Sequence, residues 1–312
     1  MNKIDRYIQA ATRDNMQRSY QSAIKHYEVT WGGFLPATSE SIVRYLADFA
    51  DTLTVNTLKA RLAALAQWHN DQGFPDPTKA PVVKKVLKGI KELHLLKEKK
   101  AKPLQLQTLS QVVSSLDDQI SIAVRINDQV SIYRCLRNRA LVLIGFWRGF
   151  RSDELSRLNV DQIQAEAGKG MSIYLNRSKT DRDSSGKTFK APALGQLCPV
   201  TAYLEWITSA KLESGPAFPK IDRWGNFSDK SITPGSIITL LRKLLEDANV
   251  ENPDSYSSHS LRRGYANWAS DSGWELKELM EYVGWKDIKS AMRYLDNTNS
   301  TDRLFNKSRS KP

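Results

Sequence analysis

Two distant stretches of the chain carry side chains that could act together on a phosphate ester. One lies near residue 150 and pairs an arginine with a glutamate, and the other spans residues 259–294. Arginine neutralises the non-bridging oxygens of a phosphate, histidine and the indole N–H donate hydrogen bonds to it, and a tyrosine hydroxyl can attack it. The pattern therefore predicts chemistry on a phosphodiester that needs no metal ion. The candidate residues are Arg151, Glu154, His259, Arg262, Trp285 and Tyr294.

Each member of this set also has an ordinary structural explanation. Arg151 begins a predicted helix, where an arginine is most often a surface charge, and Glu154 could pair with it within that helix. Trp285 follows Gly284 and could simply be a packed tryptophan. A functional interpretation therefore depends on the joint order and spacing of the residues.

His259 and Arg262 are three residues apart, so both side chains face the same side of a helix that includes them. Arg263 also lies within one turn of His259, and spacing alone does not decide between the two arginines. The alternative explanation is a histidine at the N-terminus of a helix, followed by exposed arginines.

Tyr294 can be examined by helical geometry. The apolar face of its segment is formed by Ile288, Ala291, Met292 and Leu295. At about 100° per residue, Tyr294 lies roughly 120° from the centre of that face. We therefore expect a partly exposed tyrosine, as a nucleophile requires, and not a core residue of its own helix.

The composition favours a polyanionic partner. The 312 residues carry a formal net charge of +12 and give a pI near 9.5. Residues 1–100 contain 16 Lys and Arg against 10 Asp and Glu, which gives +6 and leaves +6 for residues 101–312. Both parts of the chain are thus candidates for phosphate contacts. A solubilising excess of surface charge is the alternative.

Cysteine and histidine usage argues against disulfides and metal sites. Cys135 and Cys198 are far apart, and none of the four histidines is spaced for a zinc or two-metal site. The N-terminus lacks a signal peptide, and no stretch approaches the ~18 apolar residues of a membrane span. We therefore expect a soluble cytoplasmic protein without a membrane partner.

Residues 1–98 are predicted to be a helical domain. Capping residues at 38–41 and the Gly-Phe-Pro-Asp-Pro break at 73–77 separate its helices. Pro81 begins a basic amphipathic helix whose lysines could face phosphates or only solvent. The expected helices cover residues 4–11, 15–30, 38–49 and 56–70 and a stretch from 81 onward.

The charged segment 99–105 ends the apolar patterning near Pro103 and is predicted to be a linker. Residues 106–312 form the second predicted domain. Two strands, 171–175 and 188–193, flank a polar loop at 176–187. Helices are expected at 107–117, 117–128, 131–148, 152–157, 198–211 and 235–249 and over most of 260–305.

Taken in order, these motifs resemble those of the tyrosine recombinases, the phage integrase family. They are Arg-x-x-Glu, a lysine between two strands, His-x-x-Arg, Gly-Trp and a tyrosine nine residues later. The resemblance extends over nearly the whole chain. It implies a mainly α fold: an N-terminal helical, SAM-like core-binding domain and an α-rich catalytic domain with a small antiparallel sheet. The resemblance is to the simple members of the family, which need only a core site and have no preceding arm-binding domain.

The resemblance also assigns residues. Arg151 matches the first arginine of the family pattern, whereas nearby Arg148 does not, and Glu154 matches the acidic residue that supports it. Lys179 matches the hairpin lysine, in preference to Lys187 or Lys190.

In the C-terminal motif, His259 and Arg262 match His-x-x-Arg, which selects Arg262 over Arg263. Trp285 occupies a position held by histidine in many relatives, and Tyr294 matches the nucleophile.

The mechanism that the resemblance implies is transesterification without metal, ATP or another cofactor. Tyr294 would form a 3′-phosphotyrosyl bond, and Lys179 would protonate the departing 5′-oxygen as general acid. Strand exchange would pass through a Holliday junction, with a homotetramer on two double-stranded DNA sites. The segment 301–305, with Leu304 and Phe305, would dock into a neighbouring protomer.

The sequence leaves the DNA target and the biological role open. Three helices, around 15–30, 84–91 and 237–247, are candidates for DNA contact. A type IB topoisomerase and a DNA-binding regulator remain alternatives. The candidate contact residues are Arg18, Lys25, Lys84, Lys85, Lys88, Lys91, Arg242 and Lys243.

Overall fold

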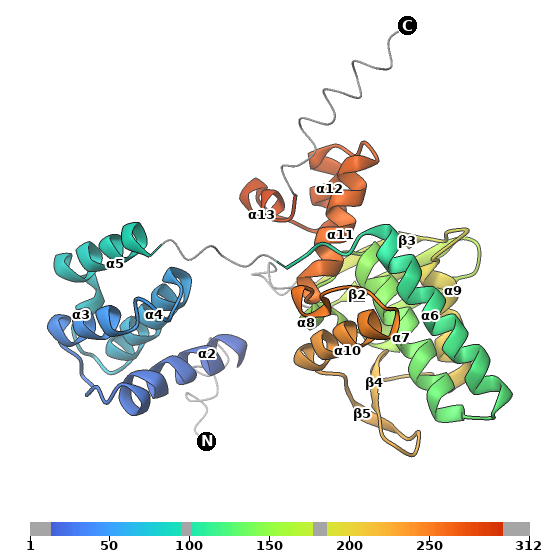
Figure 1. The fold of residues 1–312 in the computed structure, drawn as a ribbon, viewed down its shortest axis with the longest axis horizontal. Coiled ribbons are helices and arrows are strands. Elements are labelled where there is room, and N and C mark those ends of the chain that lie inside the picture. The colour runs from blue at the N-terminus through green and yellow to red at the C-terminus, as the bar shows by residue number, and fades with distance from the viewer. Residues whose placement is uncertain (1–13, 95–100, 177–185, 296–312) are drawn as a thin grey trace, which may run out of the picture. The chain divides into compact units, whose positions relative to one another are not determined.

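The computed structural model describes residues 14–94, 101–176 and 186–295. The chain divides into two compact units, residues 1–100 and 101–312 (Figure 1). The expected helix at 4–11, the candidate lysine Lys179 and the expected docking segment 301–305 lie outside the described residues.

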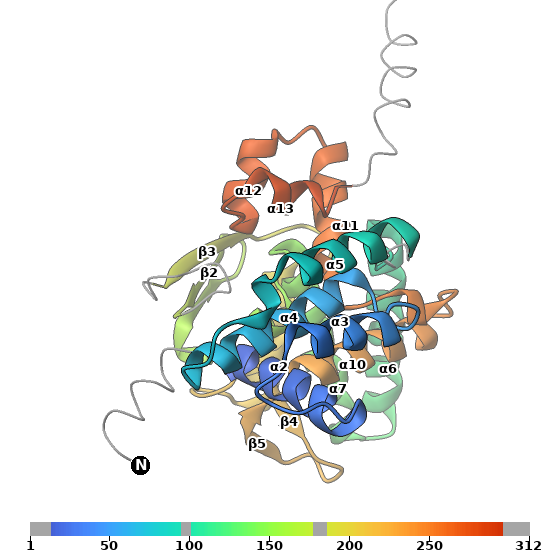
Figure 2. The ribbon, with the colours of Figure 1, turned by 90° about the vertical axis from the view of Figure 1, so that its left-hand side faces the viewer.

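The N-terminal unit is built from helices (Figure 2). Its helices agree with the ranges predicted for the described part of residues 1–98. Asp14–Lys25 continues directly into a π-helical turn, so the predicted helix 15–30 is one element with a wider last part. The helices are α2 (Asp14–Lys25), η1 (His26–Thr30), α3 (Ser39–Asp48), α4 (Val55–Asp71), η2 (Pro77–Lys79) and α5 (Pro81–Leu93).

Local sequence sets where these helices begin. Thr38 accepts a hydrogen bond from Ser41 N, and Ser41 accepts one from Thr38 N, which forms a capping box at α3. Thr54 caps α4 in the same position, and Pro81 starts α5. The lysines predicted to lie on the outer face of α5 are all exposed: Lys84, Lys85, Lys88 and Lys91.

The C-terminal unit is mainly helical with two small antiparallel sheets, which confirms the predicted fold class. Among the described residues, no helix has the length and apolar character needed to cross a bilayer. Its helices are α6 (Leu106–Arg125), α7 (Gln129–Trp147), α8 (Ser152–Leu155), η3 (Val160–Gln162), α9 (Pro199–Ala210), α10 (Pro234–Asp247), η4 (Pro253–Ser255), α11 (Ser258–Asp271), α12 (Leu276–Val283) and α13 (Ile288–Met292).

The first sheet has the order β1-β2-β3, and β2 and β3 form the predicted hairpin. Register pairs run from Gly170 opposite Pro192 to Leu175 opposite Lys187, so the hairpin loop begins directly after this last pair. Sequence reasoning missed β1, β4 and β5, which have only three to five residues each. The strands are β1 (Ile163–Glu166), β2 (Gly170–Leu175), β3 (Lys187–Pro192), β4 (Pro219–Ile221) and β5 (Phe227–Ser231).

Two predicted helix boundaries were wrong. The ranges 107–117 and 117–128 form one continuous helix, α6, because no glycine or proline interrupts the segment. Conversely, 260–305 is divided where Gly273 and Gly284 adopt positive φ angles of 89° and 80°. These left-handed conformations end α11 and α12 and change the direction of the chain.

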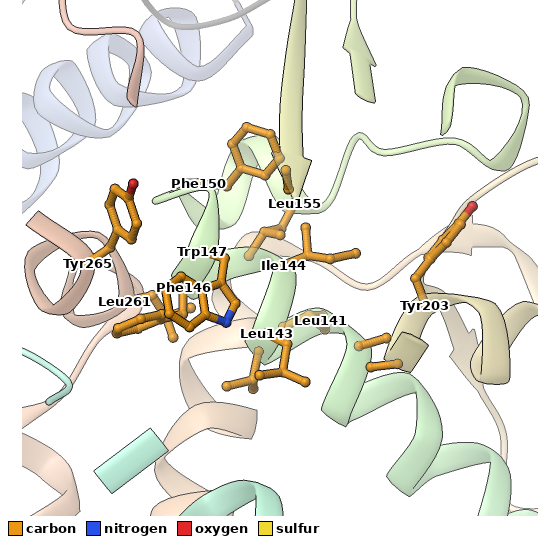
Figure 3. Close-up of a cluster of buried hydrophobic side chains, with 14 of the residues drawn as sticks. Leu141, Leu143, Ile144, Phe146, Trp147, Phe150, Leu155, Tyr203, Leu261 and Tyr265 are labelled. Atoms are coloured by element: carbon orange, nitrogen blue, oxygen red, sulfur yellow. The ribbon is translucent and has the colours of Figure 1, made fainter. Parts of the chain in front are cut away.

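Helix α7 forms the centre of the C-terminal unit. Nearly every side chain from Cys135 to Trp147 is buried, so this helix is enclosed on all sides. Phe146 and Trp147 at its end pack beside Leu261 and Tyr265 of α11 (Figure 3). This packing fixes the chain immediately before residues 148–154.

Backbone packing at the start of the unit depends on a glycine. Leu104 is fully buried, and its N–H donates to Ser260 O at 3.0 Å, while Lys102 N donates to Ser255 O at 2.9 Å. The last residues of the predicted linker 99–105 thus pack against α11 and its preceding turn. A Cβ atom on Gly264 would lie 1.9 Å from Leu104 O, which leaves no room for any side chain.

We predict that Gly264→Ala lowers the free energy of unfolding by about 1–3 kcal/mol, because the helix and the segment at Leu104 must separate. Thermal or denaturant unfolding monitored by circular dichroism measures this. Gly235→Ala in α10 is the matched control, since a Cβ there meets nothing within 4 Å. Equal stability of the two variants would contradict the packing argument.

Candidate active site

Glu154 fixes the side chain of Arg151 at the start of α8. The backbone N–H of Arg151 donates to Glu154 Oε2 at 2.8 Å, and its Nη1 donates to Glu154 Oε1 at 2.8 Å. The carboxylate of Glu154 therefore both caps the short helix α8 and orients the guanidinium of Arg151. Glu154 is only 4 % exposed, so water screens this pair little.

The same carboxylate contacts a second arginine from a distant element. Arg262 Nη1 lies 3.6 Å from Glu154 Oε2 and donates to Gly149 O at 2.8 Å. Burial, together with the nearby charge of Arg151, lowers the pKa of Arg262 to about 10, although the carboxylate of Glu154 opposes the shift. Two guanidinium groups thus meet at one carboxylate, an arrangement suited to a second anion.

The N-terminus of α11 presents His259 toward Tyr294. Ser257 accepts a hydrogen bond from His259 N and forms a capping box with Ser260. His259 Nδ1 lies 3.1 Å from Tyr294 Oη, close enough for a hydrogen bond whose direction depends on the histidine tautomer. Three residues later on the same helix, Arg262 points into the same cluster.

Trp285 forms the third side of the cluster. Helix α12 ends at Gly284, and the N–H groups of Gly284 and Trp285 both donate to Met280 O at 2.9 Å. The Trp285 ring stacks on the Tyr294 ring, with centroids 5.3 Å apart and planes 28° apart. The guanidinium carbon of Arg262 lies 5.0 Å and 5.4 Å from these two ring centres.

Two buried donors at this cluster lack a hydrogen-bond partner among the described residues. They are Nε of Arg262 and Nε1 of Trp285, and these side chains are 1 % and 5 % exposed. A buried donor without a partner costs about 1–3 kcal/mol of desolvation, so a ligand that accepts from it gains that amount.

Tyr294 lies just beyond its helix and not on it. Helix α13 ends at Met292, and Tyr294 N donates to Ala291 O in the following turn. The expected partial exposure is observed, but the expected apolar face is wrong at Ile288 and Met292, which are 60 % and 47 % exposed. Five residues are too short to present a full buried face, and only Ala291 is enclosed.

Comparison with known proteins agrees with this geometry. The model of the phage integrase family matches residues 123–301, more than half of the chain. The chain belongs to the phage integrase family. This confirms the family that the motifs indicated and, at the level of the family, the enzyme class of site-specific DNA recombinases.

Individual relatives cover most of the chain. A XerD homologue of Selenomonas ruminantium is 25 % identical over 326 residues, which span 98 % of this chain and 89 % of that protein. The Cre recombinase of Escherichia phage P1 is 26 % identical over 283 residues, 86 % of this chain and 78 % of Cre.

Solved structures share the fold. XerH bound to a palindromic difH substrate aligns with a TM-score of 0.63 at 17 % identity, over 93 % of this chain and 78 % of that chain. The Tn1549 transposon integrase in complex with transposon right-end DNA aligns with a TM-score of 0.61 at 15 % identity, over 95 % and 94 %. The fold of this family member is therefore a tyrosine-recombinase fold.

The structure brings together most of the residues that the sequence singled out. Lys179 lies outside the described residues. Of the alternatives to it, Lys187 Nζ contacts Glu281 O at 3.5 Å, while the Lys190 side chain is exposed. The residues that meet at the site are Arg151, Glu154, His259, Arg262, Trp285 and Tyr294.

The DNA-contact candidates fall into two groups. Arg18 and Lys25 on α2 are exposed, as are the lysines of α5. On α10, however, Arg242 donates to Tyr256 O and Asp254 O, and Lys243 pairs with Asp247 at 2.8 Å. These two side chains thus already have contacts within the protein.

No group of three or more His, Cys, Asp or Glu side chains that could hold a metal ion occurs within the ranges 14–94, 101–176 and 186–295.

Sequence reasoning missed one residue near the site, Arg148, which is 1 % exposed. Its only sequence signal is that a charged residue directly follows the continuous apolar stretch 140–147.

We predict that Glu154→Gln lowers the free energy of unfolding by about 3 kcal/mol, because the buried guanidinium of Arg262 and the partly buried one of Arg151 then lack their shared negative charge. Thermal unfolding measures this loss. Glu166→Gln, which removes a carboxylate from the exposed pair with Lys169, should change stability by less than about 1 kcal/mol. Similar effects of the two substitutions would show that the charge of Glu154 contributes little.

Proposed function

We propose that this protein is a site-specific recombinase in which Tyr294 attacks a DNA phosphodiester. The observation that carries the proposal is the position of Tyr294, whose hydroxyl lies 3.1 Å from His259 Nδ1 and whose ring centre lies 5.4 Å from the guanidinium carbon of Arg262. Attack produces a 3′-phosphotyrosyl bond and releases a 5′-hydroxyl. The energy of the broken bond is conserved in the new ester, so no ATP is required.

Arg151 and Arg262 stabilise the charge that develops on the non-bridging oxygens. Their fixed orientation by Glu154 favours this role, because preorganised donors need not rearrange when the charge appears. The N–H groups of Arg262 and Trp285 that have no partner within the described part of the chain supply further hydrogen bonds to the same phosphate. His259 accepts the phenolic proton or donates to the phosphate, according to its tautomer.

Lys179 acts as the general acid that protonates the departing 5′-oxygen. The hairpin from which it would reach the site is formed by β2 and β3. The 5′-hydroxyl of a partner duplex then attacks the phosphotyrosine, and the strands are exchanged through a Holliday junction. Neither a metal nor a nucleotide cofactor takes part in these steps.

The DNA partner would be a double-stranded recombination site. The charge of +12 and the exposed lysines of α5 support contacts with phosphates in both units. Among relatives of known structure, XerH was solved with a difH substrate and λ integrase as a dimer bound to a core site. We extend the proposal to a homotetramer on two DNA sites, in which the C-terminal segment 301–305 of each protomer docks into its neighbour. We also propose that the protein is cytoplasmic and associated with the nucleoid.

The decisive test is Tyr294→Phe, which removes the nucleophilic oxygen and retains the ring that stacks on Trp285. The variant should bind DNA with unchanged affinity and form no covalent complex. Sequencing the DNA that it retains from a genomic library supplies the target site. Suicide substrates built on that site then report covalent protein–DNA complexes on denaturing gels.

Normal cleavage by Tyr294→Phe would exclude Tyr294 as the nucleophile. Wild-type protein that binds the site but never becomes attached to DNA would instead indicate a DNA-binding regulator. Efficient relaxation of a supercoiled plasmid without the site would indicate a type IB topoisomerase.

The general-acid role is tested with a bridging 5′-phosphorothiolate. We predict that Lys179→Ala slows cleavage of normal DNA by about 100-fold or more, since an alkoxide leaves poorly without a proton. A thiolate leaves without protonation, so the variant should cleave the phosphorothiolate nearly as fast as the wild type does. Equal impairment on both substrates would reject this role, and Lys187→Ala serves as the control for loss of a nearby positive charge.

A further inference from the structure

The last turn of α12 is bound by cationic side chains from three different elements. The final carbonyls of a helix lack partners within it and carry partial negative charge, so cations bind there favourably. One lysine comes from β3, one arginine from the end of α7 and one from α11. The pairs are Lys187 Nζ with Glu281 O at 3.5 Å, Arg148 Nη2 with Tyr282 O, and Arg262 Nη2 with Val283 O at 3.4 Å.

Arg148 differs from Lys187 because it is buried, and from Arg262 because it has no role in the proposed chemistry. It is 1 % exposed, and burial lowers its pKa. Its guanidinium carbon lies 3.7 Å from the centre of the Tyr282 ring, and its Nη1 donates to Lys190 O of β3 at 2.9 Å. The side chain therefore joins β3 to α12.

The residues after this turn belong to the candidate site. Gly284 ends α12, and the next residue, Trp285, stacks on Tyr294 and lies against Arg262. A shift of the last turn would move the Trp285 ring and, through the stack, the phenolic oxygen. Burying the charge of Arg148 costs free energy. In this structure that charge fixes the last turn of α12, which directly precedes Trp285.

We propose that Arg148 is a positioning residue for DNA cleavage, which holds the end of α12 against β3 and so aligns Trp285 with Tyr294. The inference rests on the proposed function. Arg148 itself is too buried to contact DNA, so its loss should alter the rate of cleavage and leave DNA affinity unchanged. Misplacement of reacting groups by about 1 Å commonly slows a reaction on the order of 100-fold.

The first experiment uses full-length Arg148→Ala in single-turnover cleavage of a suicide substrate. We expect cleavage to slow by roughly 10- to 100-fold while the dissociation constant for DNA stays the same. Added guanidinium at millimolar concentration should restore most of the rate, because the ion can occupy the cavity against Tyr282 and bind both carbonyls. Sodium chloride at the same concentration should not restore it.

A second pair of variants does not depend on whether Arg148→Ala folds. Tyr282→Leu removes the ring face that receives the guanidinium, whereas Tyr282→Phe retains it. We expect Tyr282→Leu to slow cleavage and Tyr282→Phe to remain near the wild-type rate. If both variants act through the same contact, Arg148→Ala combined with Tyr282→Leu should be no slower than the slower single variant.

A wild-type rate in Arg148→Ala would overturn the inference. So would a slow rate that guanidinium leaves unchanged while Tyr282→Leu is fully active, because Arg148 would then act only on stability. Cleavage of a 5′-phosphorothiolate substrate by Arg148→Ala at the wild-type rate would also overturn the inference, since that result places the defect at the leaving group. Wild-type protein that forms no covalent complex would refute the proposed function itself, and these results are distinguishable on the same gel.

Discussion

The buried carboxylate of Glu154 lies between two guanidinium groups that would otherwise repel each other. Arg151 and Arg262 come from elements more than 100 residues apart, and both contact this one side chain, at 2.8 Å and 3.6 Å. One negative charge for two positive ones leaves an excess of positive charge in a region that water screens poorly. This excess of positive charge favours a further anion at the site.

The elements around the site are arranged to maintain that geometry. The enclosed helix α7 ends directly before Arg148 and Arg151, and its last aromatic residues pack on α11, which carries His259 and Arg262. Close contact between Gly264 and Leu104 also fixes α11. The two arginines are therefore positioned by the core of the C-terminal unit, and Tyr294, the proposed nucleophile, follows the smaller helices α12 and α13.

Sequence reasoning succeeded where local residues determine the outcome. His259 and Arg262 lie on one helix, whose start is marked by the capping residue Ser257, so their shared side follows from helical spacing. It failed where distant partners decide. Strands β4 and β5 have three and five residues, and Phe227 is held by Tyr133 and Trp206 from other elements. The exposure of Ile288 likewise reflects a helix too short to form a face.

Arg148 shows why a motif alone describes such a site incompletely. Its neighbours in sequence give no reason to bury a charge, and the family pattern assigns the chemistry to Arg151 instead. Its partners, Lys190 and Tyr282, lie 42 and 134 residues away, so only the folded chain reveals that it connects a strand to the end of α12. The proposed phosphate-binding side chains are defined by their chemistry, which a sequence motif can express. The proposed role of Arg148 depends on packing, which becomes visible only in the folded chain.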